Sequence, residues 1–179
     1  VPSHPFPFLG APVMRSTLRT HTCGALRRAA VGSVVTLCGW VNARQMSLLV
    51  GGAAALELGR LSEAATDLEL LRDWHARERV LMDWYWEAQL HTYLAELSLR
   101  RRDLERATIE AAAAREAAMA TPERTWRGRA YVTSALVAIE RRAFDEAGQY
   151  LRQARREVRG TNAPLVAWRI EAMTATLLE

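Results

Sequence analysis

The sequence lacks the features of a membrane or secreted protein. It has no apolar run of about 18 residues, so we expect no membrane-spanning helix. Its first residues contain no continuous apolar segment before a small-residue cleavage site, so we expect no secretory signal and a cytoplasmic location. Only two cysteines are present, Cys23 and Cys38, and their spacing matches neither a zinc site nor a redox CxxC pair.

The usual motifs of catalysis are missing as well. There is no GxxxxGK[ST] phosphate loop, no HExxH and no GxSxG. The four histidines are scattered, and none stands four residues from another as a helical metal site requires. The acidic residues alternate with arginines at spacings typical of a solvated helix surface. We therefore predict a protein that is not an enzyme and has no cofactor and no metal.

Lysine is absent, and the 24 basic residues are all arginine, which indicates a coding bias more than a chemical requirement. The first 45 residues contain five arginines and no acid, whereas the first acidic residue is Glu57. The remainder of the chain is nearly neutral, so the net charge of +4 belongs to this first segment. A basic segment can bind a phosphate backbone, although ordinary solvated surface is the favoured interpretation.

The chain changes character along its length. Residues 1–13 hold four prolines and a glycine, which predicts a flexible proline-rich leader. Residues 22–30 indicate a short helical turn, and residues 34–41 are rich in the β-branched and aromatic residues of a strand. From Met46 onward the apolar period is helical. The predicted helices are 46–58, 61–75, 78–100, 103–119, 123–141, 144–159 and 164–178.

A repeat of about 40 residues, a period typical of stacked helix pairs, runs through the helical part. Each of three turns is followed by an apolar residue and, three residues later, by an alanine, namely Ala64, Ala107 and Ala147. Twelve residues before each alanine lies a small residue, Gly52, Ala95 or Ala135, and Ala175 continues this series. Antiparallel helices approach to about 8–10 Å only where the crossing side chains are small. The pattern therefore predicts stacked helix pairs, three complete and a fourth begun.

Residues 46–179 resemble the tetratricopeptide repeat (TPR) family, in the longer form found in arrays of bacterial signalling and regulatory proteins. The resemblance rests on the small–small–apolar pattern around Gly52, Ala64 and Leu68 and its two copies. The spacing of about 40 departs from the usual 34, and the family's Trp and Tyr on the first helix are not in their usual places. The resemblance implies an all-α solenoid of helix hairpins that binds a protein or peptide on a concave face.

Residues 14–45 resemble the start of the OB-fold anticodon-binding domain of bacterial aspartyl-tRNA synthetases. Cys23-Gly24 and Leu26-Arg27 precede the gapless run VTLCGWVN, residues 35–42. Ala43 and Gln45 then replace basic residues of the family, and the following strands are missing. An OB barrel needs five strands, so this segment is a truncated barrel start followed by repeats from residue 46. The resemblance therefore implies no aminoacylation.

Two sets of candidate contact residues follow. An aromatic cluster near the join of the first two repeats cannot turn all its side chains to one side of a helix, so at least one is expected to face a partner. The candidates for a protein or peptide partner are Trp84, Tyr85, Trp86, His91 and Tyr131. If the basic segment binds nucleic acid, the candidates are Arg27, Arg28, Trp40, Asn42 and Arg44.

Three functions remain open on this basis. The favoured one is a non-catalytic scaffold for protein–protein or peptide interaction on a helical array. The second is a tRNA- or nucleic-acid-binding remnant of a synthetase anticodon domain, which depends on residues 14–45 alone. The third is a fusion of two gene fragments with no selected function, which fits the abrupt change between Arg44 and Met46.

Overall fold

The computed structural model describes residue 33 and residues 42–77 and 83–178. The chain divides into two units, Val1–Val41 and Asn42–Glu179, and the helices of the described residues all belong to the second. The predicted leader, helical turn and strand 34–41 lie outside the described residues. Within the described part all regular structure is α-helical, as predicted for the repeat region. The helices are α1 (Asn42–Glu57), α2 (Leu61–Arg77), α3 (Asp83–Arg100), α4 (Leu104–Met119), α5 (Arg124–Glu140), α6 (Phe144–Val158) and α7 (Pro164–Leu178).

The first helix begins earlier than the sequence pattern predicted. Residues 42–45 were expected to leave a strand, yet α1 starts at Asn42. Alanine, arginine and glutamine favour a helix, so Ala43, Arg44 and Gln45 extend the alanine-rich stretch backward. Gln45 is buried. These residues are therefore part of the helical array rather than of the segment before it.

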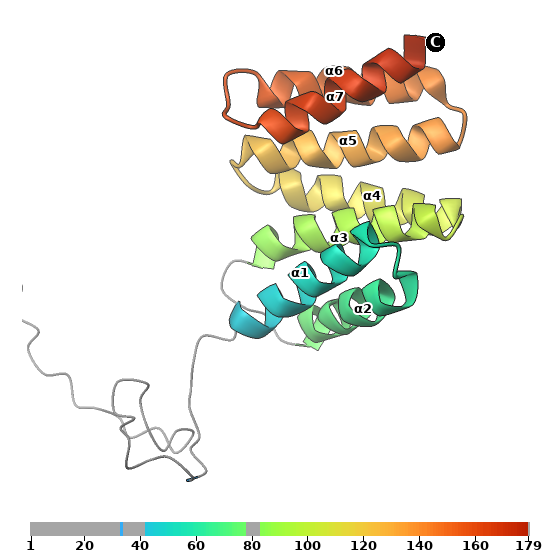
Figure 1. Ribbon diagram of the computed structural model, residues 1–179. Helices are drawn as coiled ribbons and strands as arrows, with labels where there is room; N and C mark the ends of the chain where they lie inside the picture. Colours follow the sequence, from blue (N-terminus) through green and yellow to red (C-terminus); the bar gives the residue numbers. More distant parts are fainter. Residues whose placement is uncertain (1–32, 34–41, 78–82, 179) are drawn as a thin grey trace, which may run out of the picture. The chain divides into compact units, whose positions relative to one another are not determined.

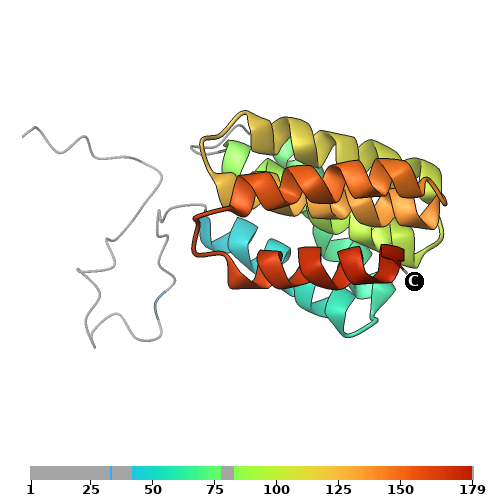
Figure 2. The same cartoon turned by 90° about the horizontal axis from the view of Figure 1, so that it is seen from above.

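The helices pair as hairpins. α1 packs on α2, α3 on α4 and α5 on α6, and each hairpin contacts the next through its second helix and the following first helix (Figure 1). α7 contacts both α5 and α6 at the end of the array, where α6 and α7 lie side by side (Figure 2). The described array is thus three hairpins and one further helix.

The small residues of the repeat lie at the helix contacts. Ala64, Ala107 and Ala147 are fully buried, and so are Ala95 and Ala135. A Cβ atom added to Gly52 would lie 2.7 Å from Cγ of Leu68, too close for any real side chain. The close approach of the helices therefore depends on these residues having little or no side chain.

The hairpin turns share one geometry. Gly59, Arg102 and Arg142 each follow the end of a first helix with a positive φ, of 74°, 62° and 60° respectively. The next backbone N–H in each turn donates to a carbonyl five residues back, as Asp103 N does to Ser98 O at 2.9 Å. This is the Schellman ending of a helix, which glycine adopts freely and arginine adopts at a cost. The turn fixes the angle at which each second helix folds back.

Candidate functional site

The first helices of the hairpins and α7 form one continuous face. α1 contacts α3, α3 contacts α5, and α5 contacts α7. We call the surface formed by α1, α3, α5 and α7 the inner face. Arg169 of α7 reaches Glu96 of α3 across α5, with Nη1 and Oε1 3.3 Å apart. Because this ion pair joins helices whose backbones are not in contact, the inner face curves around it.

A cavity of about 220 Å³ opens on the inner face. It lies between the end of α1, the middle of α5 and the first half of α7. Much of its lining is apolar, and the charged groups at its edge are Arg129, Arg169 and Glu57. Trp168, which is 67% exposed, and Leu165 form its α7 side. The cavity therefore combines apolar walls with two guanidinium groups.

Arg129 is held by aromatic rings. Its guanidinium carbon lies 4.8 Å from the ring centroid of Tyr93 and 5.2 Å from that of Trp126. Trp126 in turn meets Tyr85 edge-on, with centroids 6.0 Å apart. We call Tyr85, Tyr93, Trp126 and Arg129 the aromatic–arginine cluster. Stacking of this kind orients a guanidinium without neutralising its charge.

Within the described residues Arg129 forms no ion pair, and its buried Nε has no hydrogen-bond partner. A buried donor without a partner costs free energy, about 1–3 kcal/mol for a typical group. A ligand carboxylate or phosphate next to this guanidinium would bring the hydrogen bonds that the protein itself does not supply. The guanidinium of Arg129 thus lies beside an apolar cavity and has no acidic partner among the described residues.

The residues predicted to contact a partner fall in different places. Tyr85 is half-buried and belongs to the aromatic–arginine cluster. Trp86 is only 4% exposed and packs in the core with α1 and α2, so it has no surface to offer a ligand. Trp84 lies in α3, but its side chain is outside the described part of the structure.

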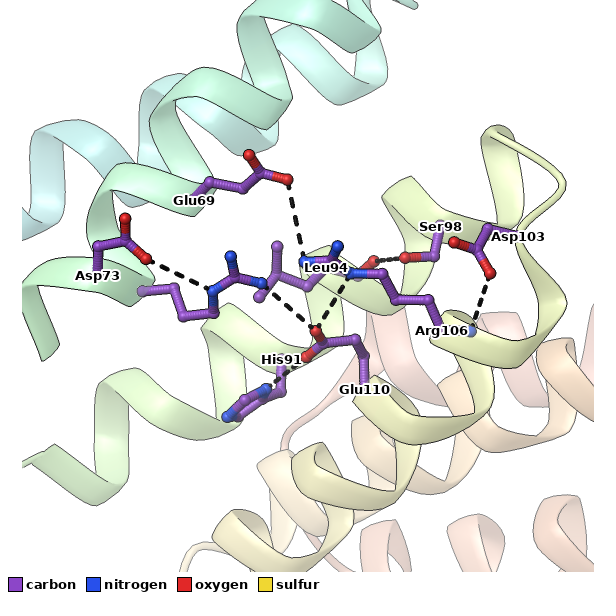
Figure 3. A network of polar contacts seen from close by, with 9 residues as sticks. Glu69, Asp73, His91, Leu94, Ser98, Asp103, Arg106 and Glu110 are labelled. Carbon is purple, nitrogen blue, oxygen red and sulfur yellow. Dashed lines mark hydrogen bonds and ion pairs between the residues drawn. The ribbon is translucent and has the colours of Figure 1, made fainter. Parts of the chain in front are cut away.

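His91 and Tyr131 do not line the cavity. His91 Nδ1 lies 2.7 Å from Oε2 of Glu110, within a polar network between α2, α3 and α4 (Figure 3). The ring of Tyr131 lies 6.3 Å from that of Tyr150 on α6. Both side chains therefore take part in contacts between helices rather than in the inner-face cavity. Contact of either residue with a partner stays a prediction.

The nucleic-acid candidates are only partly described. Arg27, Arg28 and Trp40 lie outside the described residues. Asn42 and Arg44 lie in the first turn of α1 instead of at the end of a strand, and their side chains are not described.

The sequence reasoning did not select Trp126, Arg129 and Arg169. A signal for the two arginines exists, because Arg129 and Arg169 have the same separation in the sequence as Ala135 and Ala175. They therefore occupy one repeat position on successive first helices. Trp126 precedes Arg129 by three residues, which places both on one side of α5.

The described part of the chain has neither a cluster of metal ligands nor a membrane-spanning helix. There, no three His, Cys, Asp or Glu side chains gather as a metal ion would require. None of the helices described is both long and apolar enough to cross a membrane. Among the described residues, Tyr150 on α6 has a raised pKa, chiefly because of burial.

Comparison with known proteins separates the two parts of the chain. No protein-family model matches it. The aspartate–tRNA(Asp/Asn) ligase of Rhodopirellula baltica is 58% identical over 41 residues, which are 23% of this chain and 6% of the ligase. This supports the resemblance of a short segment to that family. The chain spans only a small part of the ligase.

The fold comparison concerns the helices. The C-terminal TPR-containing domain of an FK506-binding protein of Plasmodium falciparum superposes with a TM-score of 0.53, over 75% of this chain and 89% of that domain. The sequences are 14% identical, so the likeness shows the fold alone. The helical array is therefore TPR-like, as its repeat pattern indicated.

Proposed function

We propose that the chain is a non-catalytic scaffold that binds a peptide segment of another protein on its inner face. The observation that carries this proposal is the unpaired guanidinium of Arg129, held between Tyr93 and Trp126 at the edge of an apolar cavity. Helical repeat arrays present extended surfaces of this kind to their partners. Tyrosine, tryptophan and arginine are also the residues that contribute most to binding at protein interfaces.

The size of the cavity favours a peptide over a small metabolite. Drug-sized ligands fill pockets of about 300–1,000 Å³. The cavity of about 220 Å³ is smaller and is open to the rest of the inner face. It accommodates an apolar side chain, while the adjacent Arg129 receives a carboxylate from the same peptide. The ligand is thus a segment with an acidic group next to an apolar residue.

The ion pair between Arg169 and Glu96 limits access to this surface. It spans the inner face from α7 to α3, and the Glu96 side chain is nearly buried. A peptide lying along the inner face passes beside this pair or displaces it. Arg169 is the second guanidinium available to an acidic ligand once Glu96 is released.

Selection from a displayed peptide library against the immobilised full chain tests the proposal. Synthetic copies of the selected peptides are then titrated against the wild type and Arg129→Gln. We expect Arg129→Gln to weaken binding at least tenfold, because the carboxylate loses its charged partner. Arg129→Lys should recover part of the affinity, since it restores the charge but not the planar fork.

The matched control is Arg142→Gln, an exposed arginine in the turn between α5 and α6 and outside the lining of the cavity. It should leave the affinity unchanged. The proposal fails if no peptide is enriched, or if the selected peptides bind Arg129→Gln as tightly as the wild type. Circular dichroism of each variant verifies that the helices remain folded.

The short match to a tRNA ligase favours a second function, binding of tRNA by the N-terminal segment. Retention of tRNA by the full chain at about 50 mM salt, lost with rising salt, would support it because phosphate contacts release counterions. Deletion of residues 1–41 should then abolish retention. If tRNA is not retained even at low salt, the segment has no such role, and a fusion of gene fragments becomes the better account of it.

A further inference from the structure

A set of three residues recurs at the two junctions where one complete hairpin meets the next. We call it a joint: an arginine on the second helix of one hairpin, a residue in the middle of the next first helix, and a residue on the second helix that follows. In the first joint these are Arg72, His91 and Glu110. Glu110 lies close to both others: Arg72 Nη1 is 4.0 Å from its Oε1. His91 Nδ1 is 2.7 Å from its Oε2 (Figure 3). Glu110 is thereby buried by the helices around it.

The second joint has the same construction with different chemistry. Its residues are Arg115, Tyr131 and Tyr150, each one repeat further along the chain than its counterpart in the first joint. Arg115 lies 4.9 Å from the ring centroid of Tyr150, and the ring of Tyr131 lies 6.3 Å from the same ring. Arg115 also donates to Oγ of Ser134 at 2.7 Å. The remaining cavity between α4, α5 and α6 measures only about 60 Å³.

The third joint contains two members of the set. Arg155 lies one repeat after Arg115, and Glu171 lies one repeat after Tyr131. Arg155 donates to both oxygens of Glu171, from Nε at 3.1 Å and Nη2 at 2.7 Å. Their side chains remain 51% and 65% exposed. No helix of the described part takes the place that α4 and α6 take in the first two joints.

An open groove of about 520 Å³ marks that place, between α6 and α7. Four arginines from one side of α6 line it, together with Ile170 and Glu171 of α7. The arginines are Arg152, Arg155, Arg156 and Arg159. Glu171 is the only acidic residue in the lining. The groove is therefore strongly positive.

The adjacent surface of α7 carries the small residue against which a second helix packs in the other hairpins. Ala95 on α3 and Ala135 on α5 are fully buried where those helices carry α4 and α6. Ala175 occupies the same repeat position on α7 and is exposed. The residue that allows close helix approach in the first two joints is thus uncovered in the third.

We propose that the groove between α6 and α7 binds an acidic α-helix of a partner protein. The helix packs against α7 as α4 packs against α3, with a small residue over Ala175 and a carboxylate against Arg155. Charge selects the partner, since acidic groups are favoured opposite the three further arginines around Arg155. A symmetric contact with a second copy would bring the same four arginines together, which is unfavourable.

The probe is a fluorescently labelled peptide of residues 103–120, the sequence of α4 with its caps. It carries Ala107 three residues before Glu110, the arrangement that closes the first joint, and it is acidic overall. Titrated with the full chain, it should bind saturably. Arg155→Glu should weaken binding at least tenfold, and Ala175→Arg should do the same by blocking the crossing. Both positions are exposed, so both variants are expected to fold.

A charge exchange makes the test specific. The peptide with Glu110→Arg should fail to bind the wild type and should recover binding to Arg155→Glu. Wild-type peptide binding that neither substitution affects would overturn the proposal, because the peptide would then be replacing the chain's own α4. Absence of binding overturns it too. Self-association that Ala175→Arg abolishes would identify a second copy as the occupant and contradict a separate partner.

Discussion

The first and third joints have an arginine at the same repeat position, but its carboxylate partner is buried in the first joint and exposed in the third. In the first, Arg72 and His91 surround a glutamate that is 7% exposed, and Arg106 adds a further contact at 3.7 Å. In the third, Arg155 and Glu171 form a well-aligned pair that remains in solvent. A buried carboxylate must be held by several donors, whereas an exposed pair contributes about 0–1 kcal/mol. The repeat thus places an arginine beside a carboxylate in both joints. That pair contributes to stability only where a further helix covers it.

The small residues differ in the same way. We call the first two joints closed, because α4 and α6 cover them, and the third joint open. At the closed joints the second helix buries an alanine of the first helix, whereas the equivalent Ala175 at the open joint is exposed. An identical residue is therefore a packing constraint in one hairpin and is exposed on α7 within the described part of the chain. Matched substitutions at equivalent positions measure this difference directly.

The largest contrast is expected from leucine at the alanine position. Ala135→Leu forces additional carbons between α5 and α6 and should lower the free energy of unfolding by about 2–3 kcal/mol. Ala175→Leu, on the exposed side of α7, should change it by no more than about 0.5 kcal/mol. Urea denaturation of the full chain, compared at equal m-values, measures both. Equal costs at the two sites would mean that α7 is already covered.

The next contrast concerns the carboxylates. Glu110→Ala should cost about 2 kcal/mol, because His91 and Arg72 lose their shared acceptor in a buried setting. Glu171→Ala should cost about 0.5 kcal/mol or less, since its partner remains solvated. Raising the salt concentration should further reduce the second effect and leave most of the first. A cost at Glu171 as large as at Glu110 would contradict the open character of the third joint.

The helices could be predicted from the sequence because their signals are local. Turn residues and alanine spacing set the ends of six helices to within a few residues, apart from the start of α3, where residues 78–82 are not described. The start of α1 was missed because a specific resemblance to a strand ran up to Asn42. That resemblance was given more weight than the helix propensity of residues 43–45.

The candidate site could not be predicted to the same degree. α3 is buried over much of its circumference, so periodicity did not show that Trp86 faces the core and Tyr85 the inner face. The pairing of His91 with Glu110 depends on how α3 and α4 are aligned, which no local pattern specifies. Arg129 gains its role from Tyr93 on another helix. Contacts between helices decided each of these cases.

The smallest expected effect is a change in the pH dependence of stability at the second joint, which contains Tyr150 where the first joint contains Glu110. Burial raises the pKa of Tyr150 above its ordinary 10.0, and its hydroxyl group also donates to Oε1 of Glu146 at 2.9 Å. The unfolded chain therefore loses this proton at lower pH than the folded chain does. The stability that the neutral phenol contributes is complete below pH 10.0 and is lost as the pH rises above it.

Tyr150→Phe keeps the ring beneath Arg115 and removes the hydroxyl group that titrates. The free energy of unfolding of the variant should therefore fall less steeply between about pH 9 and pH 11 than that of the wild type. Urea midpoints of the two proteins across that range give the comparison. The other tyrosines titrate in both proteins, so the difference between the curves isolates Tyr150. Parallel curves would show that the second joint admits water as freely as the third. The closed and open joints would then differ in their residues but not in their exposure to solvent.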